Sequence, residues 1–282
     1  MYKYLILLAT LLSPIVHGSC IHNTSLKPRA ATGEVPISNF GYTGTQGPLN
    51  WAALSPENAA CSSSTVQSPI NIDSKSTSLL STPPTISIPS VPSAEFENLG
   101  TTVEVICNGT TTLNGTDFTL AQFHLHTPSE HRIDEEYFPL EMHMVHESAS
   151  GGLAVIAVMF QMSSTETTDL LTAVTKNIGD IEKPGTKTET GPLDFTKLID
   201  HVQKSPLFTY TGSLTTPPCA EGLTFIVPQK PLPIDVDTYN KIKKTVRFNS
   251  RYTQNQAGEE NVLEMGCKAA ENGMLLLNGD GD

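Results

Sequence analysis

Alternation of polar and apolar residues predicts that the middle of the chain forms a β-sheet. In the run QFHLH, Gln122, His124 and His126 alternate with Phe123 and Leu125. Side chains of a strand point alternately to its two faces, so the three polar side chains line one surface together. That surface is therefore either exposed to solvent or part of a functional site.

Neighbouring segments show the same kind of pattern. Residues 101–126 are rich in Thr and Val and are broken by Asn-Gly turns, which indicates successive short strands. LEMHMVHE at 140–147 alternates, and GGLAVIAVMFQM at 151–162 is a continuous apolar run typical of a buried strand. The prolines in STPPTISIPSVP at 81–92 suit an edge strand. A large sheet is therefore expected here.

Helical periodicity is scarcer. Residues 167–181 carry apolar side chains at the three-to-four spacing of an amphipathic helix that ends near Gly179. A second, short helix is expected over 236–248. The predicted fold class is mostly β, with a large central sheet and a few short peripheral helices.

The N-terminus has the pattern of a secretory signal peptide. One basic residue precedes a short apolar run, and small residues follow near Gly18, so residues 1–18 are expected to be removed on secretion. No later segment reaches the roughly 20 apolar residues of a membrane helix. Residues 19–38 are expected to be a flexible lead-in. Residues 39–282 then form one domain, whose last ten or so residues we expect to be mobile.

Charge and cysteine content narrow the class of protein. The net charge of −12 disfavours binding to nucleic acid or to anionic membrane surfaces. Asn-x-Ser/Thr sequons make Asn23, Asn108 and Asn114 candidate glycosylation sites in an exported chain. The five cysteines favour pairing in an oxidising compartment, but the spacing leaves the connectivity open.

The strongest chemical signal combines two strands. If 122–126 and 140–147 are antiparallel neighbours, His124, His126 and His143 converge, and three neutral imidazoles form a zinc site with an open fourth position. Gln122 and Glu141 each precede a ligand by two residues, on that ligand's own face, and so can orient its second ring nitrogen. A His-x-His pair alone also suits a solvent-facing stripe; the third histidine and its acidic partner favour a metal.

Several motifs together resemble the α-class carbonic anhydrases of the secreted type. In order along the chain they are GPLNW (47–51), QSPINI (67–72), FHLH (123–126), SEHRID (129–134), LEMHMVH (140–146) and SLTTPPC (213–219). The resemblance implies an α-carbonic-anhydrase-like single domain with a predominantly antiparallel sheet. It also implies a zinc lyase that reversibly hydrates carbon dioxide to bicarbonate and a proton through zinc-bound hydroxide, with esterase activity as a side reaction.

The resemblance assigns roles to further residues. It implies that Thr215 accepts a hydrogen bond from the hydroxide and donates one to Glu130, which aims the nucleophile, and that Thr216 touches substrate or bicarbonate. An apolar wall for carbon dioxide would consist of Val145, Val155, Leu214, Leu223 and Phe225. Without the resemblance, these would be ordinary sheet core. Phe225 stands where many relatives have tryptophan.

The chain also departs from the family pattern. Thr101 occupies the usual position of the proton-shuttling histidine and cannot titrate near neutral pH, so the shuttle is unknown and turnover is expected to depend on buffer. The segment 264–282 lacks the family's closing Asn-x-Arg-Pro motif, which leaves the closing strand in doubt. His131 and His146 are interpreted as buried structural residues, and His22 as part of the lead-in.

The resemblance also implies a disulfide between Cys61 and Cys219, which would hold the loop that bears Thr215. Cys107 and Cys267 are left to form a second bridge, stay free, or link subunits into a dimer.

Two rival functions remain open at this stage. The first is a carbonic-anhydrase-like binding or scaffold protein without activity, although such relatives typically lack one or more zinc histidines. The second is an unrelated zinc hydrolase, which would want a motif such as H-E-x-x-H that the chain lacks.

Overall fold

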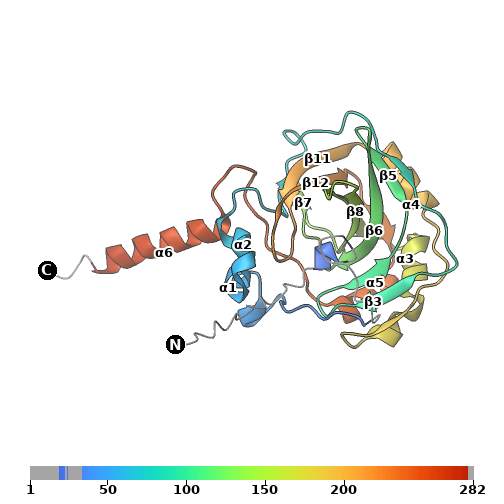
Figure 1. Ribbon diagram of the computed structural model, residues 1–282, viewed down its shortest axis with the longest axis horizontal. Coiled ribbons are helices and arrows are strands. Elements are labelled where there is room, and N and C mark those ends of the chain that lie inside the picture. Colours follow the sequence, from blue (N-terminus) through green and yellow to red (C-terminus); the bar gives the residue numbers. More distant parts are fainter. Residues whose placement is uncertain (1–18, 23, 25–33, 279–282) are drawn as a thin grey trace, which may run out of the picture.

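A large curved sheet forms the centre of the computed structural model, which describes residues 19–22, 24 and 34–278. The expected signal peptide and Asn23 lie outside the described residues. The main path of the sheet runs β10-β3-β4-β6-β8-β9-β12-β11, and most neighbours are antiparallel, as the family resemblance implies. Only β12 and β13 pair in parallel, both with β9, among the described strands of this sheet. Figure 1 shows that the sheet is strongly curved.

The strands have the following bounds. The main sheet contains β2 (Thr85–Ser87), β3 (Glu95–Asn98), β4 (Val103–Ile106), β5 (Thr110–Leu113), β6 (Thr116–His126), β8 (Leu140–Ser148), β9 (Leu153–Met162), β10 (Lys187–Glu189), β11 (Leu207–Ser213), β12 (Glu221–Pro228) and β13 (Leu232–Ile234). A small second sheet pairs β1 (Asn71–Ile72) with β7 (Arg132–Ile133). β2 pairs only with β5, which fits the edge position expected from its prolines.

Most of the helices are short. The 3-10 helix η1 lies inside the curve of the sheet, and the labelled α-helices lie outside it. The α-helices are α1 (Trp51–Leu54), α2 (Ala60–Ser63), α3 (Asp169–Val174), α4 (Thr196–Lys204), α5 (Val236–Val246) and α6 (Val262–Asn278). The 3-10 helices are η1 (Ser19–Ile21), η2 (Gly44–Gln46), η3 (Pro56–Asn58) and η4 (Thr175–Ile181). The helix expected over 167–181 is present as α3 continued by η4, and α5 matches the second expectation. α4 was not anticipated.

Each face of the sheet packs on its own hydrophobic cluster. Phe123, Leu125, Met142 and Met144 belong to one cluster, together with apolar residues of α3, α4 and α5. Val145, which alternates with the two methionines, belongs to a second cluster on the histidine face. The two-residue period therefore separates a purely structural face from the face that carries polar chemistry.

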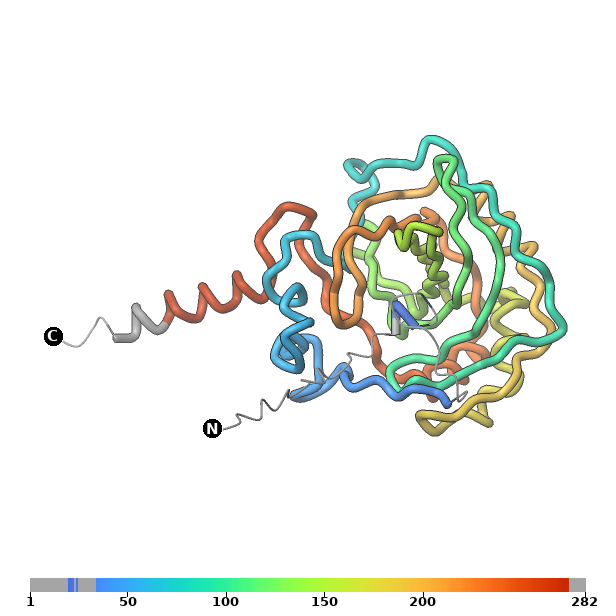
Figure 2. Tube along the Cα trace, in the orientation of Figure 1, coloured from blue at the N-terminus to red at the C-terminus, as the bar shows by residue number. Residues whose placement is uncertain are grey.

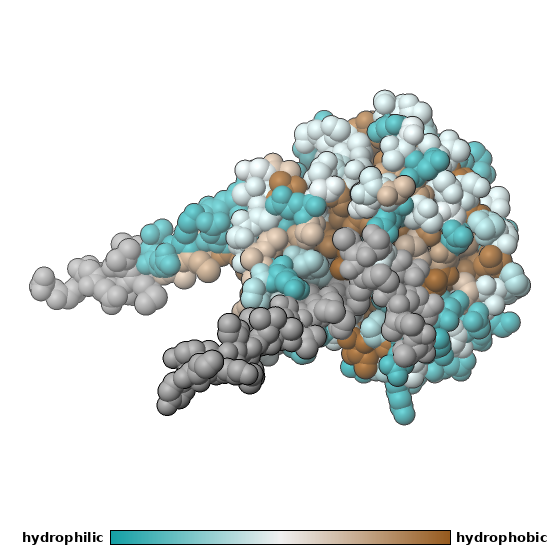
Figure 3. All heavy atoms as spheres, viewed as in Figure 1, coloured by the Kyte–Doolittle hydropathy of each residue, from teal (hydrophilic) through white to brown (hydrophobic). Residues whose placement is uncertain are grey.

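The C-terminal segment is a projecting helix instead of a strand. α6 leaves the body of the molecule in Figures 1 and 2, and its side chains from Met265 to Asn272 are exposed. Figure 3 shows hydrophilic residues along this helix and only scattered hydrophobic residues on the same face of the body. Within the described residues, no helix is both long enough and apolar enough to cross a membrane.

His146 illustrates the structural role expected for it. Its Nδ1–H donates to the carbonyl oxygen of Met144 at 2.9 Å, so Nε2 accepts from the hydroxyl of Thr111 at 3.0 Å. Burial lowers the pKa of His146 from 6.5 to about 4. The unfolded chain therefore binds a proton at this residue before the folded chain does.

We predict that His146→Gln makes the protein less sensitive to acid. Because the folded pKa lies below the unfolded one, stability falls as pH drops from 6.5 to about 4, by up to about 3 kcal/mol from this residue. Urea denaturation across this pH range should show that the free energy of unfolding falls less for the variant than for the unchanged chain. His201→Gln on α4 removes a less buried histidine whose pKa is also lowered, so it should change the pH dependence in the same direction. An equal pH dependence in His146→Gln and the unchanged chain would contradict this assignment.

Candidate active site

Two neighbouring strands bring the three histidines together. β6 and β8 are antiparallel, and His124 lies directly opposite His143. A register shift between Leu120 and Gln122 precedes this pairing. The ring centroids of His124, His126 and His143 lie 4.6 to 5.4 Å apart, and all three side chains are buried. The convergence expected from the alternating pattern is therefore present.

Two of the histidines have one ring nitrogen fixed by a neutral acceptor. The side-chain oxygen of Gln122 accepts from Nδ1 of His124 at 2.8 Å, as the sequence pattern suggested. The backbone carbonyl of Asn249 accepts from Nδ1 of His126 at 2.9 Å. Asn249 was missed by sequence reasoning, because a backbone carbonyl some 120 residues away leaves no local motif. In both rings the remaining nitrogen, Nε2, is available to a metal.

Glu141 fixes the third histidine and a second layer behind it. Its Oε1 is 2.6 Å from Nε2 of His143 and 2.6 Å from Nδ1 of His131. Its Oε2 accepts the backbone N–H groups of Glu130 and His131. Burial opposes ionisation of Glu141, but the two imidazoles outweigh it and hold its pKa well below the usual range. Nε2 of His131 lies 2.6 Å from the hydroxyl of Tyr210, so the expected structural role of His131 fits.

The donor set fits a zinc ion. Burial lowers the pKa of all three histidines, so each imidazole is neutral and keeps a lone pair on its free nitrogen at neutral pH. Nε2 of His126 is buried and has no hydrogen-bond partner, a costly arrangement that a bound cation would relieve. Three imidazole nitrogens with an open fourth position are a common set for catalytic zinc.

Glu130 and Thr215 lie together beside the histidines. Oε1 of Glu130 accepts the backbone N–H of Arg251 at 2.9 Å, and the side chain of Thr215 lies beside the carboxylate. Its Oε2 is 3.5 Å from Nε2 of His126. Burial raises the pKa of Glu130 to about 7. A Thr215 hydroxyl that donated to Glu130 would keep its lone pairs available to accept a hydrogen bond from another group.

The apolar residues implied by the resemblance also gather here. Val145, Val155, Leu214, Leu223 and Phe225 are all buried members of the cluster on the histidine face. The ring of Phe225 stacks on Tyr210, with centroids 5.0 Å apart, and lies 4.8 Å from the ring of His131. Thr216 is also buried. The site thus has one polar and one apolar side.

A disulfide holds the loop that bears Thr215. Cys61 and Cys219 are bonded across a sequence separation of 158 residues, which is the pairing that the resemblance implies. The side-chain amide of Gln67 donates to the carbonyl of Cys219, and the guanidinium of Arg251 donates to the carbonyl of Cys61. In the described structure, Cys20, Cys107 and Cys267 remain unbonded to other cysteines.

The remaining expected positions are placed as follows. Thr101 is buried, and its hydroxyl lies 2.9 Å from that of Ser38. Asn108 and Asn114 are exposed on the two turns that flank β5, so both are accessible sequons.

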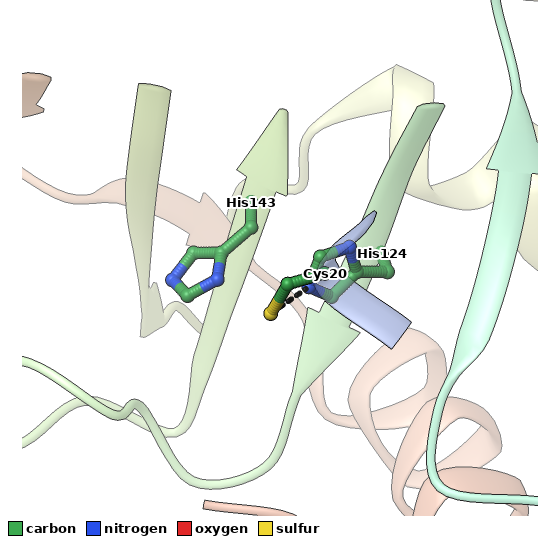
Figure 4. Close-up of side chains that lie close together, drawn as sticks. All are labelled: Cys20, His124 and His143. Atoms are coloured by element: carbon green, nitrogen blue, oxygen red, sulfur yellow. Dashed lines mark hydrogen bonds between the residues drawn. The ribbon is translucent and has the colours of Figure 1, made fainter. Parts of the chain in front are cut away.

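Cys20 and His22 enter the site, although both come from the segment expected to be a flexible lead-in. Sγ of Cys20 lies 3.8 Å from Nε2 of His124 and 3.5 Å from the hydroxyl of Thr215. Figure 4 shows the thiol between the strands that carry His124 and His143. Nδ1 of His22 lies 2.5 Å from Oε1 of Glu104. No local pattern marks a short tail segment as part of a distant site, so the sequence did not reveal them.

Known proteins share this arrangement of the chain. A family model of the eukaryotic-type carbonic anhydrases matches residues 46–262. A carbonic anhydrase of Klebsiella pneumoniae is 36% identical over 201 residues, which are 69% of this chain and 78% of that protein. The solved structure of the fungal α-carbonic anhydrase from Aspergillus oryzae has 43% identity and a TM-score of 0.79, covering 81% of this chain and 98% of its own.

A second solved structure is an α-carbonic anhydrase from Thermovibrio ammonificans in complex with the inhibitor sulfanilamide. It has 32% identity and a TM-score of 0.72, and the match covers 79% of this chain and 98% of its own. The region matched by the family model includes the histidines and their supporting residues, and it spans most of the folded body. The chain therefore belongs to the α-carbonic anhydrases.

Proposed function

We propose that this carbonic anhydrase uses a zinc ion held by His124, His126 and His143 to hydrate carbon dioxide reversibly to bicarbonate and a proton. The observation that carries the proposal is the set of three buried, neutral imidazoles, each with one nitrogen fixed by the protein and one left for a metal. A bound zinc ion would act as a Lewis acid and lower the pKa of a water molecule to about 7. Carbonic anhydrase itself is the standard example of this effect.

The neighbouring residues would orient and shelter the reactants. With its proton directed to Glu130, the hydroxyl of Thr215 would only accept from the attacking oxygen, which would aim that oxygen's remaining lone pair. Val145, Leu214 and Phe225 provide the apolar surface that suits a small, apolar molecule such as carbon dioxide. Thr216 would contact substrate or bicarbonate. The same attacking oxygen would support a side activity on activated esters.

Secretion and glycosylation belong to the proposal as well. The N-terminal signal pattern and the Cys61–Cys219 disulfide both suit an oxidising, extracellular setting. The exposed sequons at Asn108 and Asn114 would then be available for modification. The exposed thiol of Cys267 on α6 offers a route to a disulfide-linked dimer.

We predict that His143→Ala abolishes both stoichiometric zinc binding and carbon dioxide hydration, because it removes one of three ligands. Metal content per chain and stopped-flow hydration measure the two effects, and His201→Ala on α4 serves as the control. Since Cys20 lies against the site, each variant is assayed with Cys20 present and with Cys20→Ala. Full zinc occupancy without hydration in every form would favour the non-catalytic binding protein instead.

We further predict that turnover rises with buffer concentration. Thr101 cannot carry a proton out of the site near neutral pH, so an external base must do so. Stopped-flow rates across a buffer series, at constant ionic strength and with the Cys20→Ala protein, test this. A rate that is already saturated at low buffer would mean that another internal group transfers the proton.

Glu141→Gln should weaken zinc binding about 10- to 100-fold, the usual effect of removing a partner that orients a ligand. A neutral amide cannot support His143 and His131 as the carboxylate does. Chelator competition measures the affinity, and Glu147→Gln on the same strand is the matched control. An unchanged affinity in a folded Glu141→Gln protein would show that the carboxylate does not position the ligand.

A further inference from the structure

The N-terminal helix η1 lies inside the curve of the sheet. In Figures 1 and 2 this short segment sits in the middle of the body, in front of the strands that carry the histidines. Its first described residues precede the region that matches the family model, which begins at residue 46. The match to the family model therefore does not explain why η1 is buried against the histidines.

Consecutive side chains of this segment each contact a different part of the site. Cys20 is 4% exposed and contacts His124 and Thr215. Ile21 is 6% exposed and belongs to the apolar cluster of the site's wall. His22 is 1% exposed and lies against Glu104. The segment is thus held by a polar contact at each end and by apolar packing between them.

Backbone contacts add to this anchoring. The backbone N–H of Cys20 donates to the hydroxyl of Thr216 at 3.4 Å. The hydroxyl and the backbone N–H of Thr24 both donate to the carbonyl of Ile21. Hydrogen bonds of the backbone therefore help to hold the segment that carries the thiol.

The sulfur of Cys20 lies at a distance from one histidine that is close to the separation of two zinc ligands. Zinc–sulfur and zinc–nitrogen bonds of about 2.3 and 2.0 Å at a tetrahedral angle place the two donor atoms about 3.5 Å apart. The observed distance from Sγ of Cys20 to Nε2 of His124 is 3.8 Å. Ligand atoms of Cys20, His124 and His143 also lie within 4.8 Å of one another, and those of His126, Glu130 and His143 form a second group of the same size. His143 belongs to both groups, which puts the thiol beside the proposed zinc ligands.

We propose that Cys20 is a fourth ligand to the zinc ion and that Ser19–His22 closes the active site, so that the chain is made as a latent enzyme. This inference rests on the proposed function. In the closed form Cys20 would hold the ion through its sulfur as a thiolate, with its proton released to solvent, because a coordinating thiol is deprotonated. The sulfur of Cys20 also lies against the hydroxyl of Thr215, the group that would accept a hydrogen bond from the attacking oxygen. Displacement of the segment opens the site.

The test uses the full chain loaded with cobalt(II) in place of zinc. Thiolate bound to cobalt gives an intense charge-transfer band in the near ultraviolet, which imidazole and water ligands do not give. We expect this band in the unchanged protein and in Cys267→Ser, whose exposed thiol is the matched control. We expect its loss in Cys20→Ala and in Cys20→Ser. If the unchanged protein binds one cobalt without the band, the proposal is wrong.

Hydration by the zinc-loaded proteins gives the second measurement. Cys20→Ala should be about tenfold or more faster than the unchanged chain, the change expected when about nine chains in ten are closed. If the unchanged chain and Cys20→Ala hydrate carbon dioxide at equal rates and neither shows the band, the proposed closure by Cys20 is wrong. The proposed carbonic anhydrase function would be unaffected by that result. A band that depends on Cys20, without hydration in any variant, would support the ligand while the proposed function fails.

Discussion

The register between β6 and β8 is the constraint on which the site depends. His124 lies opposite His143, and a slip of one residue would turn every side chain of one strand to the other face. Such a slip would move Phe123 and Leu125 out of the core and put the histidines into it. The many apolar residues on the structural face therefore enforce the geometry of the polar face, although none of them touches the metal position.

Buried polar groups on the histidine face form one connected network. Glu141 joins His143 to His131, and Tyr210 joins His131 to Ser68 in the segment before β1. Arg251 links that same region to the disulfide through the carbonyls of Ser68 and Cys61. Because an unsatisfied buried group is costly, each member restricts its neighbours, and the turn-rich N-terminal part of the domain becomes fixed relative to the sheet.

Sequence reasoning was accurate where a local period encodes the structure. Alternation gave the strands and placed Gln122 and Glu141 beside their histidines, and the motif resemblance supplied Thr215, Glu130 and the disulfide partners. It failed where a contact joins distant segments without a repeating pattern, as with Asn249 and Tyr210. It also could not place Cys20, because burial of a terminal segment depends on the shape of a space that only the finished fold creates. α6 shows the same limit: the missing closing motif was visible, but its replacement by a projecting helix was not.

The backbone carbonyl of Asn249 has a consequence for biosynthesis. A nascent chain that has reached the end of β8 already carries all three histidines, yet it lacks both this carbonyl and the hydroxyl of Thr215. Metal binding is coupled to folding, so a nascent chain of that length would hold a cation with an incompletely oriented ligand set. Stable metal capture would then follow synthesis of nearly the whole domain, and metal occupancy would distinguish finished molecules from truncated ones.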